Sequence, residues 1–466
     1  MLATPLEAQA HARLSSPEEI AAFLARLAER TAGARLLPLG HSAGGRALTA
    51  LHLPARCRTQ APLKVLLVGS QHGASEAAGG EALMMLAREL ADDARPRALA
   101  ALEFVIYPDA NPDGRALDSA RNADEVNINR DFVLLTQPET RALDRLLREF
   151  APHVVLDAHE SAVLKTKSLA REGYMTDFET QFDCANNPAI PAALRIHAEQ
   201  DLLPTLVARV AAQGVPAQRY IREILSLRQV ATHGGLTARK FRNRAGLSGA
   251  LSFLLETRMD PKQGEYPSFR NIAVRCAKQL LAQRVFVALM AERRAVLQAL
   301  LAAHAGSDEA LVLDASYASR GPGAVLRIPM RRIVDGELRE LEFADHRQVV
   351  CGPTVARPQC YWVTAHASTF TRLLDAHGFA WQTLATAATR TVRVQAVGPH
   401  DGPWPQPRLA SRALPAGALR VPVEGPRGRL LALLLEAGSS SSVFRYGAFA
   451  RLLAVGAESF VLGEEP

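Results

Sequence analysis

Short apolar runs recur along the first 305 residues of the chain, separated by turns and by segments with helical spacing. The runs consist mainly of valine, leucine, isoleucine and phenylalanine, which favour strands. They are residues 65–68, 104–107, 154–156 and 251–255. Runs that are apolar at nearly every position are typical of strands buried on both faces of a sheet. The pattern therefore predicts a buried sheet in this part of the chain.

Helical spacing separates these runs. Residues 16–19, Ser-Pro-Glu-Glu, form a capping box that predicts a helix ending near Arg30. A second capping box at residues 136–139 predicts another helix, and residues 81–90 and 271–303 also show helical periodicity. The alternation of strands and helices predicts an α/β fold whose sheet is covered by helices on both faces.

The pattern changes near residue 306, after which short β-like runs predominate. These runs are residues 324–328, 391–394 and 419–423, interrupted by a predicted helix over 368–377 and a proline-rich loop over 402–407. We therefore divide the chain into a first domain, residues 1–305, and a smaller accessory α+β domain, residues 306–466, of unknown role.

Polar residues follow three of the apolar runs in the first domain. His72 and Glu76 come after the first run, His159 after the third, and Glu256 ends the fourth. Because the carboxyl ends of strands in an open α/β sheet form the usual ligand-binding edge, we expect these side chains to meet there. Two imidazoles and one carboxylate, with an open fourth position, suit a catalytic Zn²⁺. Glu256 would then serve as a general base.

A fourth segment brings positive charge to the same edge. Residues 111–114, Asn-Pro-Asp-Gly, have turn composition and follow the second apolar run. Arg121 and Arg130 lie in the short polar stretch beyond them, and Asn129 precedes Arg130. Two arginines placed in this way can stabilise an oxyanion and clamp a carboxylate through two hydrogen bonds.

The ordered set of motifs resembles that of zinc carboxypeptidases, or metallocarboxypeptidases, of a bacterial type with an extra C-terminal region. The resemblance covers residues 65–258 and rests on His72…Glu76, Asn-Pro-Asp-Gly at 111–114, Arg121, Asn129-Arg130, His159 and Leu-Leu-Glu256. It implies a mixed, largely parallel sheet in the first domain. It also implies that this domain hydrolyses peptide bonds, as a carboxypeptidase that removes C-terminal residues.

The same resemblance implies a role for each motif residue. One Zn²⁺ per chain would be held by His72, Glu76 and His159. Arg121 would polarise the scissile carbonyl, and Glu256 would be the catalytic base. Asn129 and Arg130 would hold the free carboxylate of a peptide or acyl-amino-acid substrate.

This chain departs from the family pattern at three positions. The family spaces its first pair as His-x-x-Glu, whereas one more residue intervenes here, so Glu81 is a rival ligand. Asn127 stands where the family often has an aspartate beside a ligand histidine, although its amide oxygen can still accept a hydrogen bond. Many members also carry a tyrosine shortly before the last glutamate, and the segment from Ile221 to Glu256 contains none.

That segment contains a basic cluster instead, Arg239 to Arg244. The cluster is either a solvated loop or a lip of the site that favours acidic substrates. The second interpretation makes Arg242 and Arg244 substrate-binding residues, and reversing their charge should then raise KM for acidic peptides.

Composition limits the partners and the compartment. The formal net charge is +7, with arginine far more frequent than lysine, which favours an anionic substrate. No basic run with interleaved aromatics or zinc finger is present, so we expect no nucleic-acid partner. The five cysteines are scattered, and neither a signal peptide nor an apolar run long enough for a membrane span is evident. We therefore expect a cytoplasmic protein without a membrane partner; its oligomeric state is left open.

Two other functions compete with the carboxypeptidase. A zinc amidohydrolase that deacylates N-acyl amino acids would need a similar metal site and a carboxylate-binding arginine. A non-catalytic binding protein with a degenerate metal site would fit the irregular His72–Glu76 spacing. A serine hydrolase is disfavoured, because the Gly-x-Ser-x-Gly pattern at residues 40–44 lies within a predicted hairpin, residues 34–55, rather than before a helix.

Overall fold

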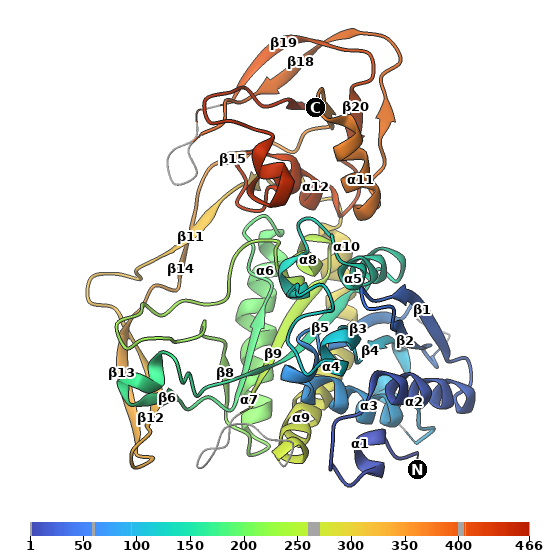
Figure 1. Ribbon diagram of the computed structural model, residues 1–466, viewed down its shortest axis with the longest axis vertical. Coiled ribbons are helices and arrows are strands. Elements are labelled where there is room, and N and C mark those ends of the chain that lie inside the picture. Colours follow the sequence, from blue (N-terminus) through green and yellow to red (C-terminus); the bar gives the residue numbers. More distant parts are fainter. Residues whose placement is uncertain are drawn as a thin grey trace.

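The computed structural model of the protein describes residues 2–57, 61–94, 96–259, 271–398, 405 and 407–465. Its main sheet has eight strands in the order β1-β2-β4-β3-β5-β9-β7-β8 (Figure 1). The strands are β1 (Arg35–His41), β2 (Ala47–Leu53), β3 (Leu63–Gly69), β4 (Leu102–Tyr107), β5 (Val154–Ser161), β7 (Thr180–Cys184), β8 (Ala217–Arg219) and β9 (Leu251–Arg258). All four predicted apolar runs are strands of this sheet.

The four central strands, β4, β3, β5 and β9, are mutually parallel. The flanking pairs β1–β2, β2–β4 and β7–β9 are antiparallel, and β7–β8 is parallel. The sheet is therefore mixed with a parallel centre, as expected. In the β5–β9 register, His159 lies directly opposite Glu256. The parallel pairing thus brings two predicted site residues to one edge.

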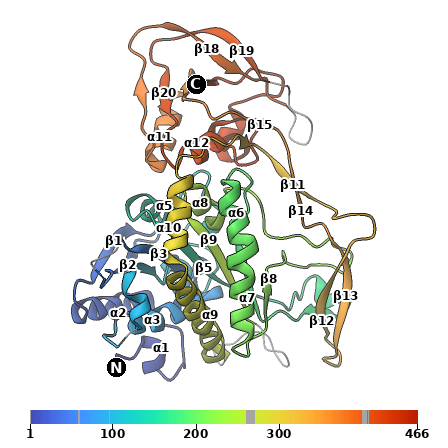
Figure 2. The same cartoon turned by 180° about the vertical axis from the view of Figure 1, so that it is seen from behind.

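Successive side chains of β3 face opposite sides of the sheet and enter different apolar clusters. Val65 and Leu67 belong to one cluster, whereas Leu66 and Val68 belong to the other. Helices α2 (Pro17–Arg30), α3 (Ala78–Ala91), α7 (Leu203–Ala211) and α9 (Ile272–Glu292) pack on the first side. Helices α5 (Pro138–Glu149) and α8 (Phe241–Leu247) pack on the second side of the sheet. Figure 2 shows α7 and α9 lying across the sheet. Both faces are therefore covered.

The two predicted capping boxes have different outcomes. At the start of α2, Ser16 Oγ accepts from the Glu19 amide and Glu19 returns a bond to the Ser16 amide, which confirms the first. The second is wrong: α5 begins after Gln137, which makes no side-chain cap. The Thr136 hydroxyl donates to Asp131 instead.

The remaining helices of this region are short or follow the predicted ones. They are α1 (Pro5–Ala8), α4 (Pro112–Ala116), α6 (Ala192–His197), which continues through a π-helical turn (Ala198–Leu202) into α7, and α10 (Arg294–His304). The α9–α10 pair confirms the helical region predicted for residues 271–303. The Asn-Pro-Asp-Gly stretch begins α4 rather than forming a simple turn, because Asn111 caps the helix through the Gly114 amide. Within the described residues, no helix is both long and apolar enough to cross a membrane.

The C-terminal region contains a six-stranded antiparallel sheet in the order β17-β20-β16-β21-β18-β19. Its strands are β16 (Cys360–Val363), β17 (Gln382–Thr383), β18 (Ala388–Val394), β19 (Arg408–Leu414), β20 (Leu419–Pro422) and β21 (Val461–Glu464), with helices α11 (Ala367–His377) and α12 (Gly428–Leu435). The predicted helix over 368–377 and the runs at 391–394 and 419–423 agree with α11, β18 and β20. Most of the proline-rich stretch at 402–407 lies outside the described residues.

An arm connects the two regions. It follows residue 305 in the sequence but packs against the first region. It consists of β10 (Leu311–Val312), β11 (Ala315–Ala318), β12 (Val325–Arg332), β13 (Leu338–Ala344), β14 (Gln348–Cys351) and β15 (Thr354–Val355). The β12–β13 hairpin at the end of the arm pairs with β6 (Tyr174–Thr176) of the first region (Figure 1). One apolar cluster also contains residues of both regions, from Phe286 to Leu433. The two parts therefore share both a sheet and a core.

Buried charged groups also join the two regions. Asp144 of α5 accepts from Arg244 Nε at 3.0 Å, and Arg427 lies 3.3 Å from the same carboxylate. His377 of α11 accepts from Arg244 through Nδ1 at 2.9 Å and donates to the Val133 carbonyl through Nε2 at 3.0 Å. Burial and the neighbouring charge of Arg244 lower the pKa of His377 well below its usual range. The histidine is thus held neutral as an acceptor.

We expect His377 to make the fold sensitive to acid. Below about pH 6.5 the unfolded chain protonates this histidine while the folded protein does not, so lowering the pH favours unfolding. The free energy of unfolding should fall by up to ~1.4 kcal/mol per pH unit from this residue alone. Because glutamine does not titrate, His377→Gln should make Tm depend less steeply on pH between roughly pH 7 and pH 5. The exposed His41→Gln is the control, and equal slopes for all three proteins would contradict the expectation.

Candidate metal centre and active site

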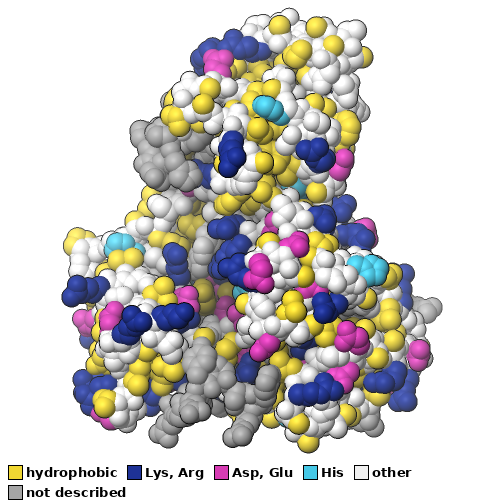
Figure 3. Space-filling model, in the orientation of Figure 1, with side chains coloured by type: hydrophobic (Ala, Val, Ile, Leu, Met, Phe, Trp, Pro, Cys, Tyr) yellow, Lys and Arg dark blue, Asp and Glu magenta, His cyan; other side chains and the backbone are white. Residues whose placement is uncertain are grey.

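Most of the predicted site residues, but not Arg121 or Arg244, line a cavity of about 970 Å³ at the carboxyl ends of β3, β5 and β9. Figure 3 shows the molecule hollowed on this face, with lysine and arginine side chains beside the opening. The wall comes from the central sheet, from the loop after β8 and from the segment that leads into α8. Parallel strands thus deliver one side of the cavity, and segments distant in the sequence deliver the other.

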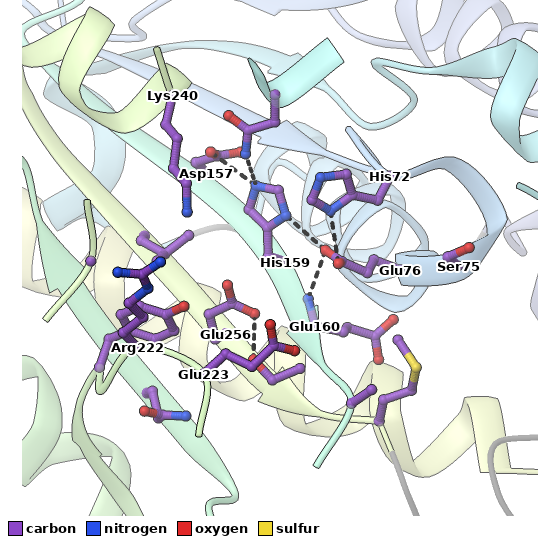
Figure 4. Close-up of a pocket in the computed structure, with 18 of the residues that line it drawn as sticks. His72, Ser75, Glu76, Asp157, His159, Glu160, Arg222, Glu223, Lys240 and Glu256 are labelled. Carbon is purple, nitrogen blue, oxygen red and sulfur yellow. Dashed lines mark hydrogen bonds and ion pairs between the residues drawn. The ribbon is translucent and has the colours of Figure 1, made fainter. Parts of the chain in front are cut away.

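His72, Glu76 and His159 lie close enough together to hold one metal ion. One ligand atom from each lies within 4.8 Å of the others. His72 Nδ1 is 2.7 Å from one Glu76 oxygen, and His159 Nδ1 is 2.7 Å from the other (Figure 4). Two imidazole nitrogens and a carboxylate are the donor set of many catalytic zinc sites. The residues present therefore fit a zinc ion.

The four-residue spacing between His72 and Glu76 is accommodated by a 3₁₀ turn, Gly73–Glu76. Gly73 has a φ of +51°, and a Cβ there would lie 2.4 Å from the backbone of Gly114. Only glycine fits that position. The rival ligand Glu81 is buried elsewhere, where it pairs with Arg115 at 3.0 Å.

Asp157 orients one of the ligand histidines. Its Oδ2 lies 3.0 Å from His159 Nε2 (Figure 4). Its Oδ1 accepts from Gln71 Nε2 at 2.6 Å. A carboxylate beside Nε2 favours the proton on that nitrogen and leaves Nδ1 free as a metal ligand. The sequence analysis overlooked this residue. Residues two apart on a strand face the same side, so the Asp-Ala-His order in β5 contained the signal.

The hydrogen bond expected from Asn127 is not made. Its Oδ1 is buried without a hydrogen-bond partner among the described residues, and the same holds for His72 Nε2. His72 Nε2 therefore has no acceptor among the described residues, whereas His159 Nε2 lies 3.0 Å from Asp157.

The pKa values of Glu76 and His159 depend on the charged groups around them. Burial raises the pKa of Glu76, but the two imidazoles outweigh it and hold that pKa well below its usual range. Burial lowers the pKa of His159, but Asp157 and Glu76 outweigh it and raise the pKa well above the usual value. The site is thus arranged around a positive charge, which a bound cation would supply in place of protons.

Glu256 lies on β9, directly opposite His159. Its Oε2 accepts from the Ser161 hydroxyl at 2.7 Å. Burial, followed by the nearby charge of Glu76, raises its pKa above the ordinary value. A carboxylate with a raised pKa near a metal site suits proton transfer.

Among the other predicted residues, Asn129 and Arg130 line the cavity and Arg121 does not. Arg130 donates to the Asn129 carbonyl at 2.7 Å, and Asn129 Oδ1 accepts from the Phe241 amide at 3.0 Å. Arg121 is exposed and donates to the Glu125 carbonyl at 2.6 Å. The structure therefore does not bring Arg121 to the reacting groups.

The basic cluster is neither a solvated loop nor a simple lip, because its second half forms α8. Arg242 lines the cavity but is buried in an ion pair with Asp183. Arg244 is fully buried, away from the cavity lining, in an ion pair with Asp144. The expectation that Arg244 contacts substrate is thus wrong, because long-range packing buries it in the second apolar layer. Charge reversal there would leave two like charges buried side by side and unfold the protein.

Comparison with known proteins agrees with this geometry. The family model for zinc carboxypeptidases matches residues 20–163. This stretch of the chain is therefore similar to zinc carboxypeptidases. It is 29% identical over 200 residues to the "Probable carboxypeptidase 2" of Trichophyton verrucosum, which is 42% of this chain and 38% of that protein. It is 31% identical over 133 residues to "Carboxypeptidase SOL1" of Arabidopsis thaliana, 25% of this chain and 26% of that protein. The chain thus spans well under half of these curated relatives.

Solved structures are also similar in part. A metallo-carboxypeptidase from Pseudomonas aeruginosa, in complex with (2-guanidinoethylmercapto)succinic acid, aligns with a TM-score of 0.46 and 21% identity, over 61% of this chain and 70% of that one. A metallo-carboxypeptidase from Burkholderia cenocepacia aligns with a TM-score of 0.44 and 19% identity, over 59% and 70%.

Two further residues line the cavity for which the sequence predicted no role. Tyr220 lines it immediately before the tyrosine-free segment, and burial together with Glu256 raises its pKa. Lys240 lines it just before α8, and burial together with Arg130 lowers its pKa to about 8. Tyr220 lies in no sequence motif, whereas Lys240 belongs to the basic cluster Arg239 to Arg244, which predicted roles only for Arg242 and Arg244. Both residues reach the cavity on segments that only folding brings close to the metal donors.

We expect Asp157→Asn to weaken zinc binding. The substitution keeps the size of the side chain but removes the charge that fixes the imidazole of His159. Loss of such a partner usually lowers metal affinity by ~10-fold to 100-fold. Competition with a chromogenic chelator measures the affinity, and the exposed Asp124→Asn is the control. Equal zinc affinity for wild type and Asp157→Asn would show that the aspartate does not orient the ligand.

Proposed function

We propose that this protein is a zinc-dependent metallocarboxypeptidase that removes C-terminal residues from peptides. The observation that carries the proposal is the convergence of His72, Glu76 and His159 within 4.8 Å, with Glu256 opposite His159 in the sheet. The zinc carboxypeptidase family match over residues 20–163 supports it.

One zinc ion per chain would be held by His72, Glu76 and His159. When bound, zinc supplies Lewis acidity and lowers the pKa of a coordinated water. Asp157 keeps His159 in the tautomer that exposes Nδ1 to the ion. The protein's own contribution is thus a fixed, largely buried donor set that needs little rearrangement.

Glu256 is the proposed general base. It takes the proton of the attacking water and then delivers it to the nitrogen of the leaving amine. Burial and the charge of Glu76 raise its pKa, which makes the carboxylate a stronger base than a solvent-exposed glutamate. The Ser161 hydroxyl holds the carboxylate in place at 2.7 Å.

Arg130 is the proposed clamp for the free carboxylate of the substrate. Its guanidinium lines the cavity, and Asn129 fixes the turn that carries it. Arg242 strengthens the positive potential of the same wall, although its charge is shared with Asp183. Polarisation of the scissile carbonyl by Arg121 would require this side chain to leave its present contact with Glu125.

A cytoplasmic location is part of the proposal. Cys351 and Cys360, which a disulfide could have joined in an exported protein, are not bonded to each other. Free thiols are usual in a reducing compartment.

We expect Glu256→Gln to lower kcat by ~10²-fold to 10⁴-fold while zinc remains bound, because the amide cannot accept the proton of water. His159→Ala should instead abolish both zinc binding and turnover. Zinc content by mass spectrometry of purified protein and hydrolysis of N-blocked dipeptides give the two readouts. The exposed Glu149→Gln, remote from the cavity, is the control.

The substrate panel should include N-acyl amino acids and a chelator-treated sample. Turnover of blocked dipeptides that the chelator stops supports the carboxypeptidase. Turnover of N-acyl amino acids alone would identify a deacylase, and an absence of bound zinc would contradict the whole proposal.

A further inference from the structure

The cavity has more positive side chains than carboxylates to neutralise them. Three cations are paired: Arg242 with Asp183, Arg275 with Glu160, and Lys165 with Glu223. Four further cations line the same cavity without an ion pair to a carboxylate in the described part of the chain: Arg130, Arg222, Arg239 and Lys240. Arg239 has other partners, since its guanidinium stacks over the Tyr446 ring at 5.4 Å and donates to the Arg130 carbonyl.

Lys240 faces more positive than negative charge. It immediately precedes α8, and its side chain points into the cavity, toward Arg222 and Glu256 (Figure 4). The charges facing it are Arg130, Arg242 and Arg222 on one side and Glu256 on the other. The surrounding cations and burial outweigh the single carboxylate and disfavour the charged amine.

An ammonium group that is half-buried among arginines raises the free energy of the empty cavity. An anion placed between these groups would remove that cost. The metal ligands and Glu256 cannot supply the anion, because zinc and proton transfer already use their charges. The missing negative charge must therefore arrive with the substrate.

One carboxylate does not account for all the cations. In the proposed function, the terminal carboxylate of a peptide binds Arg130. Lys240 and Arg222 come from two other segments, and they remain without an anion when that carboxylate is in place. A second carboxylate on the same terminal residue would reach them, since aspartate and glutamate carry one a few bonds from the first.

We propose that the enzyme selects peptides ending in aspartate or glutamate, and that Lys240, assisted by Arg222, binds the side-chain carboxylate of that terminal residue. This inference rests on the proposed function and deepens it. The sequence assigned the preference for acidic substrates to Arg242 and Arg244, but ion pairs with Asp183 and Asp144 already neutralise these two arginines. The proposal assigns it instead to Lys240 and Arg222, which form no ion pair with a carboxylate in the described part of the chain. A terminal lysine or arginine is repelled by the same wall, and a terminal glutamine leaves it uncompensated.

The test compares N-blocked dipeptides that differ only in ending with glutamate, glutamine or lysine, hydrolysed by the zinc-loaded, full-length protein. Wild type should show kcat/KM higher for glutamate than for glutamine by roughly 10-fold to 100-fold, as expected for a charge-assisted hydrogen bond. Lys240→Gln should reduce this ratio to within about 3-fold of unity, mainly through KM for the glutamate peptide. Lys240→Glu should shift the preference toward terminal lysine.

Lys167→Gln is the matched control, because Lys167 is exposed on a neighbouring loop and does not line the cavity. It should keep the wild-type ratio. Product inhibition gives a second readout that needs no variant: free glutamate should inhibit wild type more strongly than free glutamine. Zinc content and Tm of each variant show whether it is folded.

Each other outcome overturns the proposal in a distinguishable way. Equal kcat/KM for glutamate and glutamine peptides in wild type would refute the acidic preference while the carboxypeptidase stands. A loss in Lys240→Gln that is equal for all three peptides would assign Lys240 to catalysis or folding rather than selection. If wild type hydrolyses none of the peptides, both this inference and the proposed function fail.

Discussion

The parallel pairing of β3, β5 and β9 is the constraint on which the site depends. It puts the carboxyl ends of three strands at one edge and sets His159 opposite Glu256. His72 and Glu76 lie in the turn after β3. This turn packs so closely against the backbone of Gly114 that residue 73 has no room for a side chain. A shift of one residue in the β5–β9 register would turn the imidazole and the carboxylate to opposite faces. The same hydrogen bonds that hold the sheet therefore hold the catalytic groups.

Opposite charges are separated across the cavity. The sheet edge presents Glu76, Asp157 and Glu256, whereas the loops opposite present Arg130 and Lys240. Each side is unfavourable when empty, because buried like charges repel and water is partly excluded. A divalent cation on one side and an anionic peptide end on the other relieve both costs. Binding energy would thus come largely from charge complementarity rather than from apolar contact.

The C-terminal region contributes to the site although none of its residues lines the cavity. The β12–β13 hairpin pairs with β6, and its Ile328 and Met330 enter an apolar cluster with Phe178 and Ile221. Phe178 and Ile221 also line the cavity. The hairpin therefore supports the wall from behind. Tyr317 of the arm adds a hydrogen bond to the Gly234 carbonyl at 2.7 Å, which fixes the approach to α8.

The sequence by itself determined the elements with a clear period and the order of the metal donors. Apolar runs predicted the four central strands, and residues placed just after strands predicted the proposed zinc ligands and the proposed base. Such residues come together because parallel strands end at one edge of the sheet. Tertiary structure, by contrast, decided whether each cation forms an ion pair or faces the cavity. Arg244 meets Asp144, one hundred residues away, and becomes part of the core. Lys240, four positions earlier, forms no ion pair with a carboxylate in the described part of the chain and faces the cavity. Local patterns specify which face a residue occupies within its own element, but whether a charge is neutralised depends on partners that only long-range packing brings near.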